Sequence, residues 1–336
     1  MKKIINMMRD FVQKDVLPAY ILCYKPIVLV SYEFDFVKNS DEILETLPKN
    51  KKIYAMLMLG WHRETEERIE ELVQDIATLK KKNKNIEYVI MANCQNEYSM
   101  IKNAGLDAIF CHQNAFLNPD AYHVIPKINR KYDAIYIARV TPFKRHELTK
   151  NIKKLKLIGS NSFKEKKYFD KTLQLLSHAD WIRGVRFKNI YKAINQAKVG
   201  LCLSEEEGAM FVSAEYLLCG LPIVNTKNLG GRDSLFDEEY VITTEPTPDA
   251  VNKAMQKLIN KNIDPIDIRE KTIEKMNAHR QTLIDFIQNK CDLAGIEKKY
   301  SAIWENVYTQ KLGIRTTVPI FTKQRKRVLK KGMTLD

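Results

Sequence analysis

The stretch from residue 203 to residue 233 carries the residues best suited to chemistry. A strand is expected to end at Ser204, three glutamates follow it, and Gly208 is expected to open a helix that runs to Cys219. Gly220 then stands where a left-handed residue would end that helix. A helix that starts behind a glycine presents free backbone N–H groups and the positive end of its dipole. The pattern therefore predicts a binding site for a diphosphate at the start of this helix.

The charged side chains near this predicted binding site could have a structural role or could bind a ligand. Glu205 and Glu206 could simply offset the dipole of the helix. Arg139 and Lys144, which are five positions apart across Pro142, could be solvated residues of a loop after another expected strand. If these cations face a ligand instead, they would stabilise the negative charge that develops on a departing phosphate. Arginine would donate two parallel N–H hydrogen bonds to the phosphate oxygens, and lysine would provide a compact positive charge.

Short apolar runs alternate with amphipathic segments between residues 26 and 260. Runs rich in β-branched and aromatic residues predict a first set of strands at IVLVSY, KIYAMLML, EYVIMA and DAIFC, and a second at DAIYIA, KLKLIG, VGLCLS, PIVNT and YVITT. Helices are predicted over RETEERIEELVQDIATLKKK and near residues 145–153, 188–197, 210–219 and 247–260, and the chain from Pro265 onward is predicted to be helical. This order predicts an α/β protein with two doubly wound, Rossmann-like parallel-sheet domains that face a cleft, with ligands in the loops after the strands.

The bulk composition is that of a globular protein, with 45% hydrophobic and 29% charged residues in 336. No apolar run is long enough for a membrane helix, and the first residues lack the apolar core of a secretory signal. We therefore expect a cytoplasmic protein whose six scattered cysteines are reduced and mostly buried. No metal site is expected among them.

The net charge of +14 fits three kinds of partner, namely nucleic acid, an anionic membrane surface or phosphorylated small molecules. Most of the lysines lie on expected helix faces, where they would be solvated. The cluster from Lys323 to Lys331 is denser and predicts peripheral attachment to the inner face of the cytoplasmic membrane. It lacks interleaved aromatic residues and any nucleic-acid-binding signature, so no nucleic acid is expected as a partner.

Three motifs together resemble those of the retaining group 1 (family 4) glycosyltransferases. Glu207 and Glu215 match the E-x7-E signature, followed in register by Cys219-Gly220-Leu221-Pro222 and by Gly230-Gly231. Arg139 and Lys144 match the R-x4-K loop. A weaker match, NAFLNPDAYHVIP over residues 114–126, resembles the linker before the donor-binding domain.

This resemblance implies a GT-B fold and the transfer of a sugar from a nucleotide diphosphate donor. It implies that Glu215 binds the donor ribose, that Glu207 lies near the transferred sugar, and that Arg139 and Lys144 hold the diphosphate. Further donor contacts are expected from Arg145 and from the segment Gly208, Ala209, Met210, Phe211 and Val212. Arg145 and Met210 stand where the family usually has glycine.

The resemblance also implies an acceptor-side domain over residues 1–130, a donor-binding domain over 131–296, and a segment 297–336 that returns to the first domain through a helix near 297–311. His62 and His112 follow expected strands of the first domain and are candidates for a donor-sugar contact or a proton relay, the alternative being ordinary loop histidines. Glu33 and Asp35 have the look of a metal-binding pair, but GT-B enzymes need no metal for departure of the leaving group. No metal and no cofactor are therefore expected.

The function implied is transfer of a sugar, with retention, to a glycan or lipid-linked acceptor in surface polysaccharide or lipopolysaccharide assembly. Two alternatives stay open at this point. One is another GT-B enzyme, either an inverting transferase or a sugar-nucleotide epimerase. The other, suggested only by the net charge, is a basic nucleic-acid-binding protein without catalytic activity.

Overall fold

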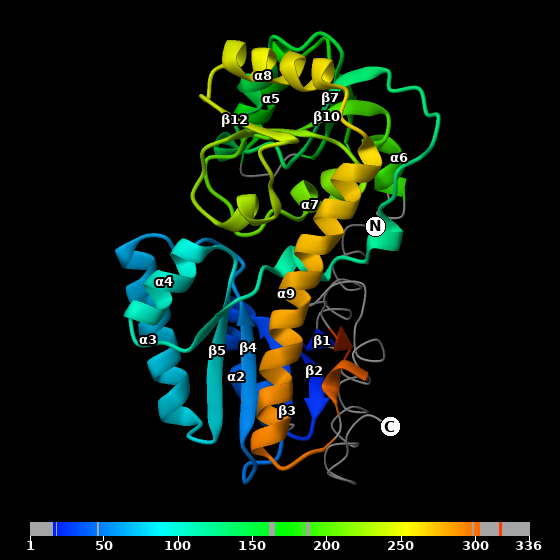
Figure 1. Ribbon diagram of the computed structural model, residues 1–336. Coiled ribbons are helices and arrows are strands. Elements are labelled where there is room, and N and C mark those ends of the chain that lie inside the picture. The colour runs from blue at the N-terminus through cyan, green and yellow to red at the C-terminus, as the bar shows by residue number, and fades with distance from the viewer. Residues whose placement is uncertain are drawn as a thin grey trace. The chain divides into compact units, whose positions relative to one another are not determined.

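The chain forms two compact units in the computed structural model, which describes residues 16–17, 19–45, 47–160, 165–183, 185, 189–297, 299–302 and 316–317 (Figure 1). Unit 1 contains the described residues up to Leu117 together with those from Ala278 onward. Unit 2 is Asn118–Asn277. The long helix α9 (Pro265–Leu293) begins in unit 2 and ends in unit 1.

The chain changes from one unit to the other earlier than the expected boundaries at residues 130/131 and 296/297. The segment after Asn118 already bonds to unit 2. Arg269 of α9 donates to the carbonyl of Pro119 at 3.0 Å, and the Asn195 side chain accepts from the backbone N–H of Ile125 at 2.8 Å. These hydrogen bonds join the predicted linker to the domain that follows it.

Unit 1 is built on a five-stranded sheet with the order β2-β3-β4-β5-β6. The strands are β2 (Ala19–Tyr24), β3 (Ile27–Tyr32), β4 (Ile53–Met58), β5 (Ile86–Ala92) and β6 (Ala108–Phe110). The strands from β3 to β6 are parallel, as predicted, whereas β2 was not predicted and pairs antiparallel with β3. A short pair, β1 (Val16–Leu17) with β13 (Thr316–Thr317), forms a separate two-stranded sheet.

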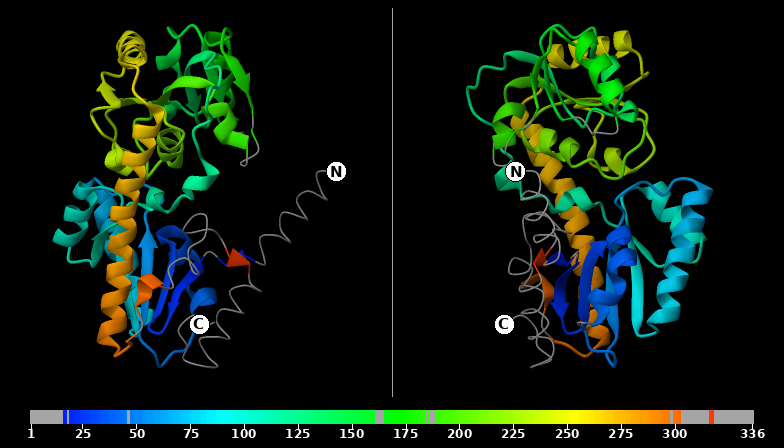
Figure 2. Two further views of the ribbon diagram at one scale, coloured as in Figure 1. Left: turned by 45° about the vertical axis from the view of Figure 1, so that its right-hand side comes forward. Right: turned by 180° about the vertical axis from the view of Figure 1, so that it is seen from behind.

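Helices cover both faces of this sheet (Figure 2). One face packs α2 (Glu33–Glu45), α3 (Glu66–Lys82) and α4 (Gln95–Asn103) over a core that includes Leu29, Leu57, Leu72 and Ile101. The part of α9 in unit 1 covers the opposite face, where Lys290 lies over the ring of Tyr54. Both faces are therefore apolar, which explains why the strands read as continuous hydrophobic runs.

Unit 2 has a six-stranded, wholly parallel sheet with the order β12-β11-β10-β7-β8-β9. The strands are β7 (Tyr132–Ile137), β8 (Leu155–Ile158), β9 (Asp180–Ile182), β10 (Ala197–Cys202), β11 (Ile223–Thr226) and β12 (Val241–Thr244). The five predicted strands are confirmed, and β9 is the one that was missed. Because all six are parallel, their carboxyl ends meet at one edge.

The helices of unit 2 are α5 (Lys166–Leu175), α6 (Ile190–Ile194), α7 (Phe211–Leu218) and α8 (Pro248–Lys261). Thr247 caps α8 as predicted, accepting from the Ala250 N–H. Gly220 ends α7 with φ +70°, also as predicted. The helix expected over residues 145–153 was wrong, because two 3-10 turns, η3 (Pro142–Lys144) and η4 (His146–Thr149), are separated there by Arg145 in the left-handed region.

The prediction of helix from Pro265 onward holds only as far as Leu293. Gly295, with φ +67°, turns the chain two residues later, and Tyr300–Ala302 form a 3-10 turn. The rest of the helix expected near 297–311, and the lysine-rich cluster Lys323–Lys331, lie outside the described residues. No helix in the described ranges is long and apolar enough to cross a membrane.

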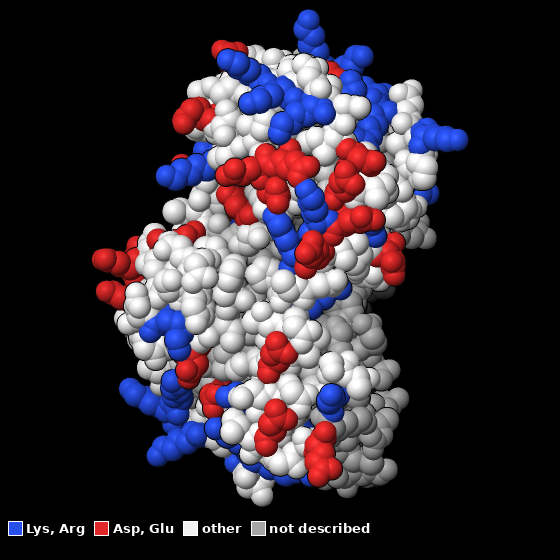
Figure 3. All heavy atoms as spheres, in the orientation of Figure 1, with Lys and Arg blue, Asp and Glu red and all other residues white. Residues whose placement is uncertain are grey.

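The positive charge of the described surface is dispersed (Figure 3), and the cysteines are unbridged and mostly buried. Lysine and arginine side chains are spread over both units in Figure 3. The last turn of α3 gathers three of them, Lys80, Lys81 and Lys82. Cations at a helix C-terminus offset its dipole, so this gathering has a structural explanation. All six cysteines are unbridged and five of them are buried, with Cys94 half-buried.

Candidate functional site

A buried ion pair joins the two motifs of unit 2 at the carboxyl edge of its sheet. Lys144 ends η3 after β7, and Glu207 lies in the loop after β10, the strand that pairs with β7. The Nζ of Lys144 contacts Oε1 of Glu207, and the two residues are only 8% and 6% exposed. Burial lowers the pKa of Lys144, and the neighbouring carboxylate opposes that shift. One residue from each motif therefore contributes to this ion pair.

Arg139 stands close to the same pair but faces solvent. It follows β7 directly and is exposed. Its charge acts on Lys144 and contributes to lowering the lysine pKa. The R-x4-K loop therefore carries one exposed arginine and one buried lysine, and the two charges are close enough to influence each other.

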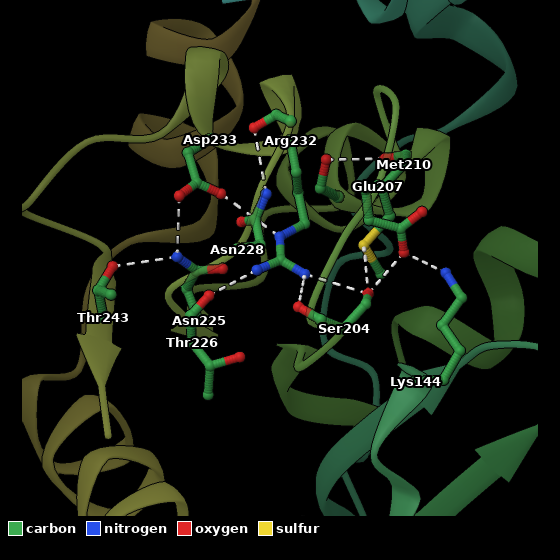
Figure 4. A network of polar contacts seen from close by, with 12 residues as sticks. Lys144, Ser204, Glu207, Met210, Asn225, Thr226, Asn228, Arg232, Asp233 and Thr243 are labelled. Atoms are coloured by element: carbon green, nitrogen blue, oxygen red, sulfur yellow. Dashed lines mark hydrogen bonds and ion pairs between the residues drawn. The ribbon is translucent and has the colours of Figure 1, made fainter. Parts of the chain in front are cut away.

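Two residues that sequence reasoning missed extend the ion pair into a network (Figure 4). The Ser204 hydroxyl donates to Oε1 of Glu207 at 2.5 Å. Arg232 donates from one guanidinium nitrogen to the Ser204 carbonyl and hydroxyl, both at 3.1 Å, and from another to the Thr226 carbonyl at 2.6 Å. Arg232 is fully buried. The only sequence signal for it is an arginine placed directly after Gly230-Gly231.

The glycine pair holds the Glu207 loop in place through the backbone. The Glu207 N–H donates to Leu229 O at 2.9 Å, and the Gly231 N–H donates to Gly208 O at 3.0 Å. Gly230 has φ +107°, and a Cβ built there would lie 1.9 Å from the carbonyl oxygen of Glu207. The two loops are therefore in backbone contact at a point where no other residue fits.

Two positions where the related family has glycine keep a glycine-like backbone. Arg145 has φ +51° and Met210 has φ +45°. The guanidinium of Arg145 turns inward, donating to Leu203 O at 2.7 Å and to the Thr226 hydroxyl at 2.8 Å. These bonds tie Arg145 to the strand ends, and its contact with a phosphate stays a prediction.

Helix α7 begins later than predicted. Gly208 does not open it, because Met210 is its left-handed N-cap residue and the helix starts at Phe211. Gly208 and Ala209 belong instead to the loop that bonds to the glycine pair, while Phe211 and Val212 form the first turn. The role of this segment in binding a donor stays a prediction.

Glu215 lies on α7 in a contact of its own. It is 8% exposed and accepts a hydrogen bond from the Tyr122 hydroxyl at 3.0 Å. Burial and the Glu215 charge raise the pKa of Tyr122. Tyr122 comes from the 114–126 motif, and Arg269 contacts its carbonyl oxygen. The structure therefore brings Lys144 and Glu207 together, while Glu215 contacts Tyr122.

His146 packs against Tyr136, which is hydrogen-bonded to the R-x4-K loop. Its ring is buried, 4.8 Å from the ring of Tyr136, and the Tyr136 hydroxyl donates to the Lys144 carbonyl at 2.5 Å. Burial, with the nearby Lys144 charge, lowers the pKa of His146 to about 3, against a hydrogen bond to the backbone at Ala138. This imidazole is therefore neutral at physiological pH and adds no positive charge to the site.

The candidate histidines of the acceptor side lie in unit 1 and are buried. His62 Nδ1 accepts from the Glu64 N–H at 3.5 Å. His112 Nδ1 accepts from the Asn114 N–H at 3.1 Å and so caps the 3-10 turn η1 (Gln113–Phe116). Both contacts are local and structural. A role for either ring toward a donor stays a prediction.

The acidic pair Glu33 and Asp35 lies in the first turn of α2, and both residues are buried. Glu33 pairs with Arg63 at 2.8 Å, and the backbone carbonyl of Asp35 accepts from the Asn39 side chain at 2.7 Å. Over the described ranges, no three His, Cys, Asp or Glu side chains are grouped so that they could hold a metal ion.

Comparison with known proteins finds a family match over unit 2 and several structures of similar fold. Residues 120–277 match the family model for glycosyl transferases group 1. The structure resembles that of HepE from Anabaena in complex with UDP, with a TM-score of 0.60 and 13% identity over 80% of this chain and 79% of that one. It also resembles sucrose-phosphate synthase from Thermosynechococcus elongatus, with a TM-score of 0.57 and 13% identity over 79% and 72% of the two chains.

A third solved structure, the trehalose-6-phosphate synthase OtsA, gives a TM-score of 0.52 and 12% identity over 76% of this chain and 75% of that one. A comparison with curated proteins finds no match. Two parallel-sheet units of this kind define the GT-B class of fold. Nearly all of unit 2 matches the group 1 model, and this match indicates a glycosyltransferase.

Proposed function

We propose that the protein transfers a sugar, with retention and without a metal ion, from a nucleoside diphosphate sugar to a glycan or lipid-linked acceptor. The observation that carries this proposal is the Lys144–Glu207 pair at the carboxyl edge of a parallel sheet, with Arg139 beside it. Cations and a carboxylate fixed together at such an edge suit a ligand that has a diphosphate next to a sugar.

The proposed reaction breaks the bond between the anomeric carbon and the diphosphate oxygen and forms a bond from that carbon to an acceptor hydroxyl oxygen. Lys144 and Arg139 stabilise the negative charge on the departing diphosphate, while Glu207 contacts the transferred sugar. Glu215 binds the ribose, which requires the ribose hydroxyls to replace or join the Tyr122 hydroxyl at its carboxylate. The proton of the acceptor hydroxyl passes to the leaving phosphate.

The donor is best identified by binding. Because a ligand that binds the folded state raises apparent stability, we expect a UDP-, GDP- or ADP-sugar in a panel that also contains CMP-sugars to raise the Tm. The CMP-sugars carry a single phosphate and should not. UDP-sugars come first in the panel because the similar HepE structure holds UDP. If no member raises the Tm of the wild-type protein, the proposal of a nucleotide-sugar donor is overturned. Among GT-B alternatives, the anomeric configuration of the product separates retention from inversion.

We extend the proposal to the place of action, which would be the inner face of the cytoplasmic membrane, in surface polysaccharide or lipopolysaccharide assembly. Its support is the cluster Lys323–Lys331, since each cation near an anionic surface contributes about 1 kcal/mol. Flotation with anionic vesicles should carry the full chain to the lipid layer and leave a chain without residues 322–336 behind. Equal flotation of both chains would contradict attachment through this cluster.

A further inference from the structure

The carboxylate of Glu207 is held by one of its two oxygens. Both the Lys144 ammonium and the Ser204 hydroxyl bond to Oε1. In Figure 4 the other oxygen, Oε2, points away from both partners. An anchored Oε1 fixes the plane of the carboxylate, so Oε2 is the oxygen that is presented to a ligand.

The two anchors of Oε1 differ in what a donor would do to them. Lys144 is a flexible point charge, and a bound diphosphate would compete with Glu207 for it. Ser204 has no such competitor, because it is fully buried and Arg232 fixes it through both its carbonyl and its hydroxyl. The serine anchor would therefore remain when the lysine turns to the phosphates.

Arg232 is suited to hold this anchor. Its guanidinium is fully buried and bonds to backbone oxygens of Ser204 and Thr226, which end or follow β10 and β11. A buried cation is costly unless it is paired. The partner that approaches the guanidinium of Arg232, Asp233 at 3.4 Å, has a 45% exposed side chain. The Glu207 carboxylate, reached through one hydroxyl, supplies buried negative charge on the other side.

We propose that Arg232, acting through Ser204, is a positioning residue that keeps Oε2 of Glu207 aimed at the donor sugar while Lys144 binds the diphosphate. This inference rests on the proposed function. It predicts that loss of the Ser204 hydroxyl harms the sugar-dependent step and spares the binding of a nucleoside diphosphate, which carries no sugar.

The test compares Ser204→Ala with the wild-type chain by two measurements, using each nucleotide of the donor panel and its sugar-free counterpart, beginning with UDP-glucose and UDP. Because a hydrogen bond to a charged group is worth more than a neutral one, kcat for donor turnover should fall about 10- to 100-fold. The Kd for the sugar-free nucleotide should stay within about twofold, since its contacts are intact. Ser204→Thr, which restores a hydroxyl, should recover most of the loss.

A matched control separates positioning from general loosening of unit 2. Thr172 is also buried, and its hydroxyl donates to a backbone carbonyl, Tyr168 O, at 2.7 Å in α5. Thr172→Val should lower the Tm as Ser204→Ala does and leave kcat unchanged. The double variant of Ser204→Ala with Arg232→Lys should be no slower than the slower single variant, because both act through one hydroxyl.

The outcomes distinguish this inference from the function on which it rests. Wild-type kcat for Ser204→Ala, or equal losses in kcat and in affinity for the sugar-free nucleotide, would overturn the positioning role alone. Additive losses in the double variant would do the same. Failure of the wild-type protein to bind every nucleotide of the panel would overturn the proposed function, and the positioning role with it.

Discussion

Replacing Lys144 by methionine should lower kcat/KM for the nucleotide sugar by about 100- to 1000-fold, the range seen when one fixed group that stabilises transition-state charge is removed. The ammonium is buried beside Glu207, with Arg139 close by. Methionine keeps most of the side-chain volume and removes only the charge. The loss should therefore fall on the step in which the diphosphate departs.

Steady-state donor turnover, measured with and without acceptor, checks this result. Lys150→Met is the control, because Lys150 is an exposed lysine at the end of the neighbouring turn η4, and its kcat/KM should equal that of the wild type. Lys144→Arg keeps the charge and should retain more activity than Lys144→Met. Wild-type turnover by Lys144→Met would show that this cation does not face the leaving group.

Replacing Gly230 by alanine should destabilise unit 2 by about 3 kcal/mol or more and abolish transfer, since two costs add at this position. Its φ of +107° lies in a region that only glycine populates readily, and the new Cβ would lie 1.9 Å from Glu207 O. The obstacle is backbone and cannot rotate away. Relief requires the Glu207 loop to move, which displaces the carboxylate from Lys144 and Ser204.

The Gly105→Ala variant measures the cost of a positive φ without the cost of a Cβ clash. Gly105 has φ +77°, and nothing lies within 4 Å of a Cβ built there, so alanine should cost only about 1 kcal/mol from the left-handed backbone. This residue is in a turn of unit 1 and should not change turnover. Urea unfolding measures both variants. A Gly230→Ala chain as stable and active as Gly105→Ala would contradict the backbone contact between the two loops.

Local pattern predicted most of the fold. Strands β3, β4, β5, β7 and β10 were evident because parallel strands buried on both faces must be continuously apolar. Strand β2 was not predicted, although AYILCY is a continuous run between Pro18 and Lys25, and β9 escaped prediction because it has only three residues. The turns at residues 142–149 were taken for helix because left-handed Arg145, which separates them, leaves no mark in hydrophobic spacing.

The residues of the candidate site were also only partly predictable from the sequence. Lys144 and Glu207 could be named from sequence because each follows an apolar strand in a recognisable motif, and strands that pair in parallel bring their ends together. Ser204 and Arg232 could not, because a polar residue after a strand and an arginine in a loop are common and say nothing about their partners. Only the strand order places Arg232 within reach of two strand ends.

By itself, then, the sequence determined most of the parallel strands of both sheets, the loops that follow them and the charged residues of the two motifs at the candidate site. Tertiary structure alone decided that Arg145 turns inward, that Glu215 pairs with Tyr122, and that Arg232 bonds to Ser204. The physical reason is the separation along the chain over which each kind of signal acts. Hydrophobic periodicity is local along the chain, whereas a buried hydrogen bond joins residues tens of positions apart once the strand order has brought them together.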